Sequence, residues 1–276
     1  MNHFETKKKN LKMQMRQYAS EDVIVAFSGG VDSSLLLKLA CDFAEETGAS
    51  VYGVFFHTML HPTSEVKSAR KVAEEMKAIF RVLKINELEA AGISDNPKDR
   101  CYRCKKYLFE TLKKEAGHLG VERILEGTNE DDLHVYRPGM RAVKELGIIS
   151  PLAESGLTKK EVRRLADEYG ISVAQKPSAP CLATRFPYGV RLSYEAMNKV
   201  HQGEEYLRKM GLYNVRLRSH GEIARIEVDV DAMEKVLEER DNISEYMKEL
   251  GYVYVTLDLE GFRSGSMDKE NAAGGI

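Results

Sequence analysis

The sequence predicts an α/β protein with a parallel sheet covered by helices on both faces, plus a smaller C-terminal α+β domain. Two observations carry this prediction. In the first half of the chain, short β-rich runs alternate with helical stretches, which is typical of a parallel sheet built from strand–helix–strand units. After a proline-rich loop, the order changes to helix, strand, strand, helix, strand.

The strands of the first half are short apolar runs. "VIVAF" (23–27) predicts a buried strand because it is continuously apolar. The helix that follows over 33–48 ends at Gly48. The other expected elements are a strand over 51–56, a helix near 64–77, a strand near 79–85, a helix beginning near residue 101, a strand over 123–127 and an amphipathic helix over 157–170.

The stretch over 174–193 contains Pro177, Pro180 and Pro187 and therefore cannot be one helix. We interpret it as an ordered loop that joins two domains. The expected organisation is a first domain over 1–175, a linker over 176–192 and a substrate or oligomerisation domain over 193–276. The last domain should contain a helix over 193–210, strands over 213–219 and 223–230, a helix over 231–249, a strand over 252–259 and a frayed tail over 266–276.

The composition narrows the class of protein. The chain has 276 residues and a net charge of −2, so its overall charge gives no reason to expect nucleic-acid binding. No apolar run approaches the roughly 20 residues of a membrane span, and the N-terminus lacks the apolar core of a secretory signal. A cytoplasmic protein is expected. There, four cysteines favour metal binding or reactive thiols over disulfides.

A glycine pair stands between a strand and a helix in "VIVAFSGGVDSSLL". Glycines let backbone N–H groups turn toward an anion, and a helix N-terminus adds partial positive charge. Asp32 can bind a Mg²⁺ that bridges phosphate oxygens. An ordinary turn with a serine cap is the alternative, which the complete SGGVDSS string disfavours. The candidate phosphate-binding residues are Ala26, Ser28, Gly29, Gly30, Asp32, Ser33 and Ser34.

A second loop, "EGTNEDD" (126–132), follows an expected strand. Ligand-binding loops of open α/β sheets lie at such strand ends. Gly127, Asn129 and Asp132 are therefore candidate nucleotide or metal contacts, although an acidic, solvated loop is the favoured interpretation when the stretch is taken alone.

SGGVDSS is similar to the PP-loop of ATP pyrophosphatases, a superfamily that includes GMP synthetases and tRNA-thiolating enzymes. The resemblance implies that ATP is cut between its α- and β-phosphates with the help of Mg²⁺. AMP is then left on an acceptor oxygen, and pyrophosphate is released from the glycine loop.

The cysteines differ in setting. Cys41 lies mid-helix and is expected to pack as a small apolar residue. Cys101 and Cys104, spaced i and i+3 at a helix start, should point to one side, among basic residues that favour thiolates. Cys181 lies in the proline-rich loop. The residues alone allow a zinc site completed by His57, His61 or His134, a redox couple, or a [4Fe–4S] cluster on three cysteines with one iron open.

A wider resemblance covers residues 20–266 and identifies the chain as similar to the LarE family. The motifs that carry it are SGGVDSS, NPKDRCYRCK, EGTNEDD, PSAPCLATRFPYG, VRLRSHGEIARIEV and LDLEGFRSGSM. The family comprises ATP-dependent sulfur transferases of nickel-pincer nucleotide synthesis. The resemblance implies adenylation of a carboxylate on a pyridinium biscarboxylic acid mononucleotide, followed by conversion to a thiocarboxylate.

Two sulfur sources occur in this family. In one type, a cysteine at the position of Cys181 gives up its own sulfur and becomes dehydroalanine. In the other, cysteines at the positions of Cys101, Cys104 and Cys181 bind a [4Fe–4S] cluster that carries an extra sulfide. All three are present here, so the resemblance implies the cluster type, supplied by a sulfide donor.

Arg216 and Arg218 are two residues apart on an expected strand and should project from one face. Paired guanidinium groups suit a phosphate monoester, so these two are predicted to hold the substrate phosphate. A solvated strand face is the alternative. Arg185 is a candidate for the same pocket or for pyrophosphate, and the weaker candidates are His220, Arg225 and Arg263.

Two other functions compete with this interpretation. A tRNA thiolase with a similar cluster would show a basic surface or an RNA-binding module, which the near-neutral charge disfavours. A nucleotide-binding regulator would not need Asp32 together with the cysteine triad. The expected partners are a small pyridinium nucleotide, a sulfide donor and further copies of the chain, which the resemblance suggests form a hexamer; no nucleic acid or membrane is expected.

Overall fold

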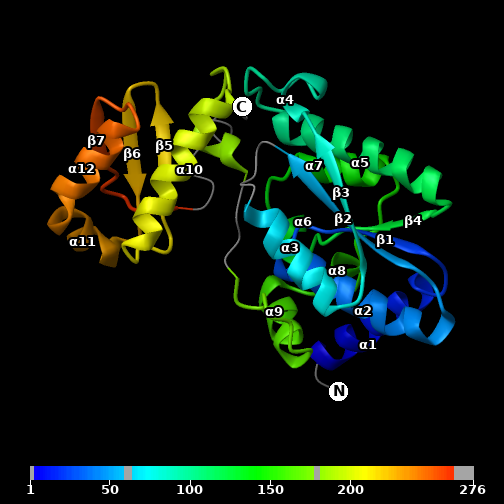
Figure 1. Cartoon of the computed structure of the whole chain (residues 1–276). Coiled ribbons are helices and arrows are strands. Elements are labelled where there is room, and N and C mark those ends of the chain that lie inside the picture. Colours follow the sequence, from blue (N-terminus) through cyan, green and yellow to red (C-terminus); the bar gives the residue numbers. More distant parts are fainter. Residues whose placement is uncertain (1–2, 59–63, 177–180, 264–276) are drawn as a thin grey trace, which may run out of the picture. The chain divides into compact units, whose positions relative to one another are not determined.

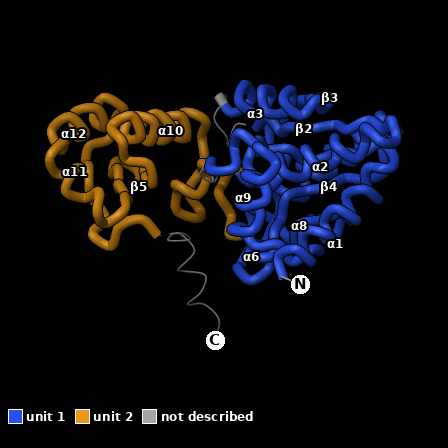
Figure 2. Tube along the Cα trace, turned by 90° about the horizontal axis from the view of Figure 1, so that it is seen from below, with its two compact units in different colours: residues 1–93, 99–179 blue, residues 94–98, 180–276 orange. Residues whose placement is uncertain are grey.

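The structure is a computed structural model that describes residues 3–58, 64–176 and 181–263 (Figure 1). The prolines expected at 177 and 180 and the expected tail over 266–276 lie outside the described residues. The chain divides into two compact units (Figure 2). Unit 1 comprises Met1–Ile93 and Asp99–Ala179, and unit 2 comprises Ser94–Lys98 and Pro180–Ile276.

Unit 1 is built on a parallel four-stranded sheet in the order β3-β2-β1-β4. β1 lies in the middle, and Val23 is in register with Val51 on one side and with Arg123 on the other. The predicted parallel sheet is confirmed. The strands are β1 (Val23–Ala26), β2 (Val51–Thr58), β3 (Ile79–Ile85) and β4 (Arg123–Leu125).

Helices cover both faces of this sheet, as predicted. Alternate residues of β1 belong to different apolar clusters: Val25 packs with Leu36 and Leu165, whereas Ile24 packs with Phe109. The helices of unit 1 are α1 (His3–Tyr18), α2 (Val31–Thr47), α3 (Ser64–Glu75), α4 (Glu87–Ala90), α5 (Arg100–Leu119), α6 (Glu130–Leu133), α7 (Gly139–Glu145), α8 (Pro151–Glu154) and α9 (Lys159–Glu168).

The N-terminal helix α1 is an element that the sequence analysis did not predict. Its mean hydropathy is low, because most of its residues are charged or polar. Phe4, Leu11 and Met15 are nevertheless buried at helical spacing, and they join the same apolar cluster as α2 and α9.

Unit 2 contains a three-stranded mixed sheet in the order β5-β6-β7, antiparallel between β5 and β6 and parallel between β6 and β7. The predicted order of helix, strand, strand, helix and strand is confirmed except that two helices stand between β6 and β7. Its elements are η1 (Leu182–Arg185), α10 (Tyr194–Lys209), β5 (Arg216–His220), β6 (Ile223–Glu227), η2 (Val230–Ala232), α11 (Met233–Glu238), α12 (Arg240–Glu249) and β7 (Tyr254–Leu257).

The single helix expected over 231–249 is wrong. The chain forms a short 3₁₀ turn and then two helices, α11 and α12, with Glu239 between them at φ −91° and ψ 12°. Neither proline nor glycine marks this break in the sequence, so pattern alone could not place it.

In the described part of the stretch expected as a loop over 174–193, a short 3₁₀ helix, η1, follows directly after Cys181. Thr184 closes this turn, because its backbone N–H and its hydroxyl both donate to the Cys181 carbonyl. Among the described residues, no helix is long and apolar enough to cross a membrane.

Candidate functional site

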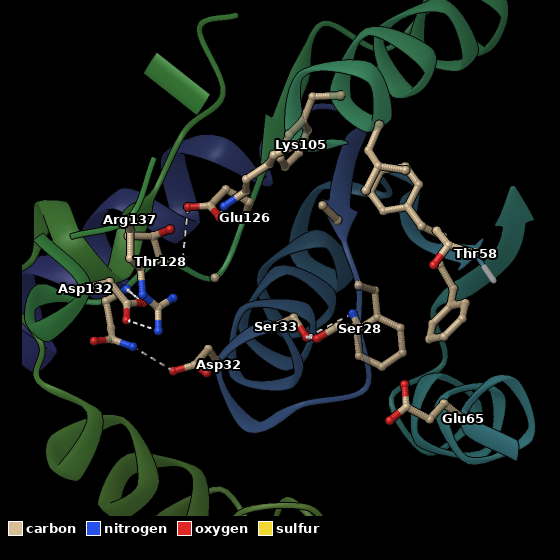
Figure 3. Close-up of a pocket in the computed structure, with 18 of the residues that line it drawn as sticks. Ser28, Asp32, Ser33, Thr58, Glu65, Lys105, Glu126, Thr128, Asp132 and Arg137 are labelled. Atoms are coloured by element: carbon tan, nitrogen blue, oxygen red, sulfur yellow. Dashed lines mark hydrogen bonds and ion pairs between the residues drawn. The ribbon is translucent and has the colours of Figure 1, made fainter. Parts of the chain in front are cut away.

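A cavity of about 530 Å³ opens in unit 1 at the carboxyl ends of β1, β2 and β4. Figure 3 shows Ser28 in the loop before α2 and Asp32 and Ser33 in the first turn of that helix, on the side of the cavity opposite Glu126 and Lys105. Four phenylalanines and a leucine make another part of the wall apolar: Phe27, Phe55, Phe56, Leu108 and Phe109. The cavity therefore combines an apolar section with a polar section at a helix N-terminus.

The glycine loop turns back on itself through its serines. The Ser28 and Ser33 hydroxyls lie 3.2 Å apart, and Ser33 also donates to the Gly30 carbonyl at 3.2 Å. Gly29 takes φ +70°, and a Cβ there would meet Ala69 at 3.1 Å, so this position requires glycine. Of the predicted loop residues, Ala26, Ser28, Asp32 and Ser33 line the cavity, while Ser34 is fully buried beneath it.

The second predicted loop reaches the first one. Asn129 caps α6, and its amide Nδ2 donates to Asp32 Oδ1 at 3.3 Å. Asp132 completes this cap by accepting the Asn129 backbone N–H at 3.2 Å. Gly127, Asn129 and Asp132 all line the cavity, so the structure brings together the two loops that the sequence predicted separately.

A Gly127→Ala substitution is expected to weaken nucleotide binding by at least about tenfold, because a Cβ at this position would lie 3.0 Å from both Asp32 Cβ and Ser33 N. Isothermal titration with an ATP analogue measures the change. Gly117→Ala is the matched control, since a Cβ there meets nothing within 4 Å in helix α5. Equal affinities of the two variants would contradict the close approach of the loops.

Three cations in the cavity were not predicted, and each is paired with a carboxylate. Lys159 forms an ion pair with Asp32, and Arg137 pairs with Asp132 at 3.0 Å. Lys105 pairs with Glu126 at 3.2 Å. Lys105 directly follows Cys104 on a helix that the sequence predicted. This helical position is the signal from which a cation near the cysteine pair could have been inferred.

Glu126 is buried and stays ionised. Burial alone would raise the pKa of its carboxyl, but Lys105 and hydrogen bonds from Ser150 and Thr128 outweigh this effect and hold the pKa below its usual range. The ion pair with Lys105 therefore persists at neutral pH.

The cysteine pair lies in the first turn of α5, as the helix prediction required. Cys101 is exposed and Cys104 is half-buried, and their spacing places both on one side of the helix. The neighbouring basic residue Arg103 is held by Asp99 at 2.8 Å. Lys105, one turn after Cys101, lines the cavity, so α5 carries both the thiols and a cavity cation.

Cys181 belongs to unit 2 and is half-buried before η1. Within the described part of the chain, no three His, Cys, Asp or Glu side chains gather to hold a metal ion. Burial raises the pKa of the Cys41 thiol to about 12, in line with the expected packing role.

The histidines proposed as zinc ligands have different settings. His134 contacts Glu130 at 2.9 Å, whereas His57 lies on β2 with a buried Nε2 atom. His61 lies outside the described residues.

Arg216 and Arg218 project from the face of β5 opposite to Leu217. Arg218 is buried, donates to Glu227 at 2.8 Å and also donates to the Thr184 carbonyl at 2.7 Å. Arg216 stacks over the Phe262 ring at 4.9 Å.

Burial and the neighbouring Arg185 and Arg218 lower the pKa of Arg216 to about 10. The group still carries its charge at neutral pH, but it does so in positive surroundings that an anion would relieve.

Arg185 forms a buried ion pair with Glu204, with Nε donating at 2.6 Å. Glu204 also accepts from Arg208 at 2.6 Å and from the Leu217 backbone at 3.1 Å. The pair fixes η1 to α10 and β5. A pyrophosphate role of Arg185 stays a prediction, and its side chain is not among those that line the cavity of unit 1.

Comparisons with known proteins support the interpretation of the glycine loop as a PP-loop. Residues 2–135 match the model of a PP-loop domain. A pyridinium-3,5-bisthiocarboxylic acid mononucleotide synthase of Lactiplantibacillus plantarum is 36% identical over 263 residues, which are 95% of this chain and 94% of that protein. An uncharacterised protein of Synechocystis sp. is also 36% identical, over 92% of this chain and 96% of its own length. A tRNA-specific 2-thiouridylase of Geotalea uraniireducens is 29% identical over 56% of this chain and 51% of its own length.

Proposed function

Because the chain belongs to the LarE family of PP-loop, ATP-dependent sulfur transferases, we propose that it acts on pyridinium-3,5-biscarboxylic acid mononucleotide in nickel-pincer nucleotide synthesis. A carboxylate oxygen of this substrate attacks the α-phosphorus of ATP, and the bond to the β-phosphate oxygen breaks. Hydrosulfide then attacks the activated carbonyl carbon, and AMP leaves. The thiocarboxylate is the product. The near full-length match to the synthase of L. plantarum is the observation that carries this proposal.

The cavity of unit 1 supports the first step. The N-terminus of α2 and the Ser28 and Ser33 hydroxyls suit the β- and γ-phosphates, and the phenylalanines suit the adenine. Asp32 is the proposed Mg²⁺ ligand, with Asn129 and Asp132 as neighbours. Lys159, which is paired with Asp32 here, would be free to move to a phosphate oxygen once Mg²⁺ takes the carboxylate.

For the second step we propose a [4Fe–4S] cluster on Cys101, Cys104 and Cys181. The donor set fits, because cysteine thiolates are the ligand type that such clusters use and the spacing of Cys101 and Cys104 puts both on one side of α5. With three cysteine ligands, such a cluster would leave one iron able to bind a hydrosulfide. The protein's own part is to hold the thiols and to keep Lys105 of the same helix in the nucleotide cavity.

The substrate phosphate is assigned to the arginine face of unit 2. On the same face as Arg216 and Arg218 lies Arg225, which is in register with Arg218 and shares Glu227 with it. The sulfide donor is proposed to be a separate molecule, and the active form an oligomer in the cytoplasm.

Arg216→Ala is expected to raise the KM for the pyridinium mononucleotide about tenfold or more, because a charge-assisted contact to phosphate is lost. The KM for ATP should not change. Steady-state kinetics on both substrates measures this. Arg240→Ala, at an exposed arginine of α12, is the matched control. An unchanged KM in Arg216→Ala would overturn the phosphate assignment.

Substrate dependence of pyrophosphate release tests the function as a whole. Release should require the pyridinium biscarboxylic acid mononucleotide and should not respond to unmodified tRNA. Release that depends on tRNA would contradict the proposal and favour a tRNA thiolase, the activity named for the relative from G. uraniireducens.

A further inference from the structure

The five residues Ser94–Lys98 are a short piece of chain that packs with unit 2, although the residues on both sides of them belong to unit 1 (Figure 2). The chain continues directly from this piece into α5, which starts at Arg100 and carries the cysteine pair. A segment that packs with a different unit from the residues on either side of it requires specific contacts with that unit.

Asn96 supplies those contacts. Its side-chain Nδ2 donates to the Pro187 carbonyl at 2.8 Å and to the Phe186 carbonyl at 3.2 Å. Its own carbonyl accepts the Gly189 N–H at 3.1 Å. Two residues earlier, the Ser94 carbonyl accepts the Leu192 N–H at 2.7 Å. Four hydrogen bonds therefore fasten the segment to the chain that follows Cys181.

Asparagine suits this position for two reasons. The side chain is fully buried, so an amide with two N–H groups can satisfy two carbonyls that no strand partner reaches. The backbone takes φ +48°, a left-handed conformation that asparagine tolerates better than most residues. An ordinary loop residue has neither a fully buried polar side chain nor a positive φ. Asn96 is also not among the residues that line the cavity of unit 1.

The Asn96 hydrogen bonds matter because both bonded segments lie close in sequence to the candidate cluster cysteines. Asn96 stands five residues before Cys101, and Phe186 stands five residues after Cys181. Five residues span at most about 17 Å when fully extended. The Asn96 hydrogen bonds therefore limit how far the Cα atoms of both cysteines can stray from one anchored point.

We propose that Asn96 is a positioning residue that ties the chain leading to Cys101 and Cys104 to the chain leaving Cys181, so that all three thiols can bind one cluster. This inference rests on the cluster of the proposed function, but the tie itself can be measured without iron. Breaking the side-chain contacts should let the two cysteine-bearing segments move independently, while the helix that carries the pair stays intact.

Asn96→Gly removes the side-chain contacts without straining the backbone, because glycine adopts a positive φ freely. Two iron-free backgrounds are treated anaerobically with a short bismaleimide. Cys104→Ser leaves Cys101 and Cys181 to be linked, and Cys181→Ser leaves Cys101 and Cys104 as the control pair within α5. Cys41 can remain, because it packs against the apolar cluster of unit 1 and burial raises the pKa of its thiol.

Asn96→Gly is expected to slow the Cys101–Cys181 link about tenfold, which corresponds to about 1.4 kcal/mol, and to leave the Cys101–Cys104 link unchanged. Peptide mass spectrometry at successive times measures the rates of both cross-links. Where the glycine variant does not fold, Asn96→Ala replaces it, because alanine removes the amide without burying a charge or adding backbone freedom. Equal rates with and without the Asn96 amide, or no Cys101–Cys181 link in the parent, would overturn the tie. Failure of the parent to bind iron, with the link intact, would instead overturn the cluster.

Discussion

Cys101→Ala is expected to lose its bound iron and to form no more than traces of thiocarboxylate, while ATP is still cleaved in the presence of substrate. The cysteine lies exposed in the first turn of α5, outside the set of residues that line the nucleotide cavity. Removing one of three thiolate ligands leaves two on a cluster that needs three, whereas the adenylation site keeps all its side chains. Iron and acid-labile sulfide analysis, the visible absorption near 400 nm and a pyrophosphate assay measure the three effects.

Cys41→Ser is the matched control for this variant. Cys41 is a half-buried thiol of α2 that packs against the apolar cluster, so its loss should leave iron content and product formation unchanged. Thiocarboxylate formation by Cys101→Ala at the rate of the parent protein would show that sulfur reaches the adenylate without the cluster.

Asp32→Asn is expected to lower the rate of pyrophosphate release about 10²- to 10³-fold, the range seen when one stabilising group of a transition state is removed. The carboxylate is the centre of the polar end of the cavity, where it contacts both Lys159 and Asn129. An amide has the same shape, but it neither binds Mg²⁺ as well nor balances the lysine charge. Single-turnover kinetics with saturating ATP measures the chemical step.

Asp42→Asn serves as the control, because Asp42 stands on the same helix and pairs with Lys38 away from the cavity. Iron content should be unaffected in both variants. If Asp32→Asn retains the parent rate over a range of Mg²⁺ concentrations, the metal assignment of Asp32 is wrong.

The adenylation half of the site was predictable because it is local in sequence. A strand, two glycines and a helix occupy one continuous stretch, and the physical reason for each residue type can be read there. The Gly127 loop was expected at the carboxyl end of a strand, where ligand-binding loops of open α/β sheets lie. Its close approach to Asp32 was not predicted, because it depends on β4 pairing with β1. The ion pair between Lys159 and Asp32 was not predicted, because 127 residues separate the two in sequence. Only the packing of α9 against α2 brings them together.

In unit 2, too, contacts between residues of different elements could not be predicted. The alternation of β5 correctly put Arg216 and Arg218 on one face, but the partner of Arg218, Glu227, depends on the register between β5 and β6. Likewise, the ion pair between Arg185 and Glu204 depends on where η1 packs on α10. Sequence pattern gives the face of a strand, whereas register and packing decide which charge is already neutralised.

The number of product molecules per chain tests the central claim most directly. Anaerobically reconstituted protein is supplied with ATP, Mg²⁺, the pyridinium biscarboxylic acid mononucleotide and excess sulfide, and product, iron and intact protein mass are measured together. We expect about four irons per chain, many thiocarboxylates per chain and an unchanged Cys181. Product that stops at one per chain, with Cys181 converted to dehydroalanine, would contradict it.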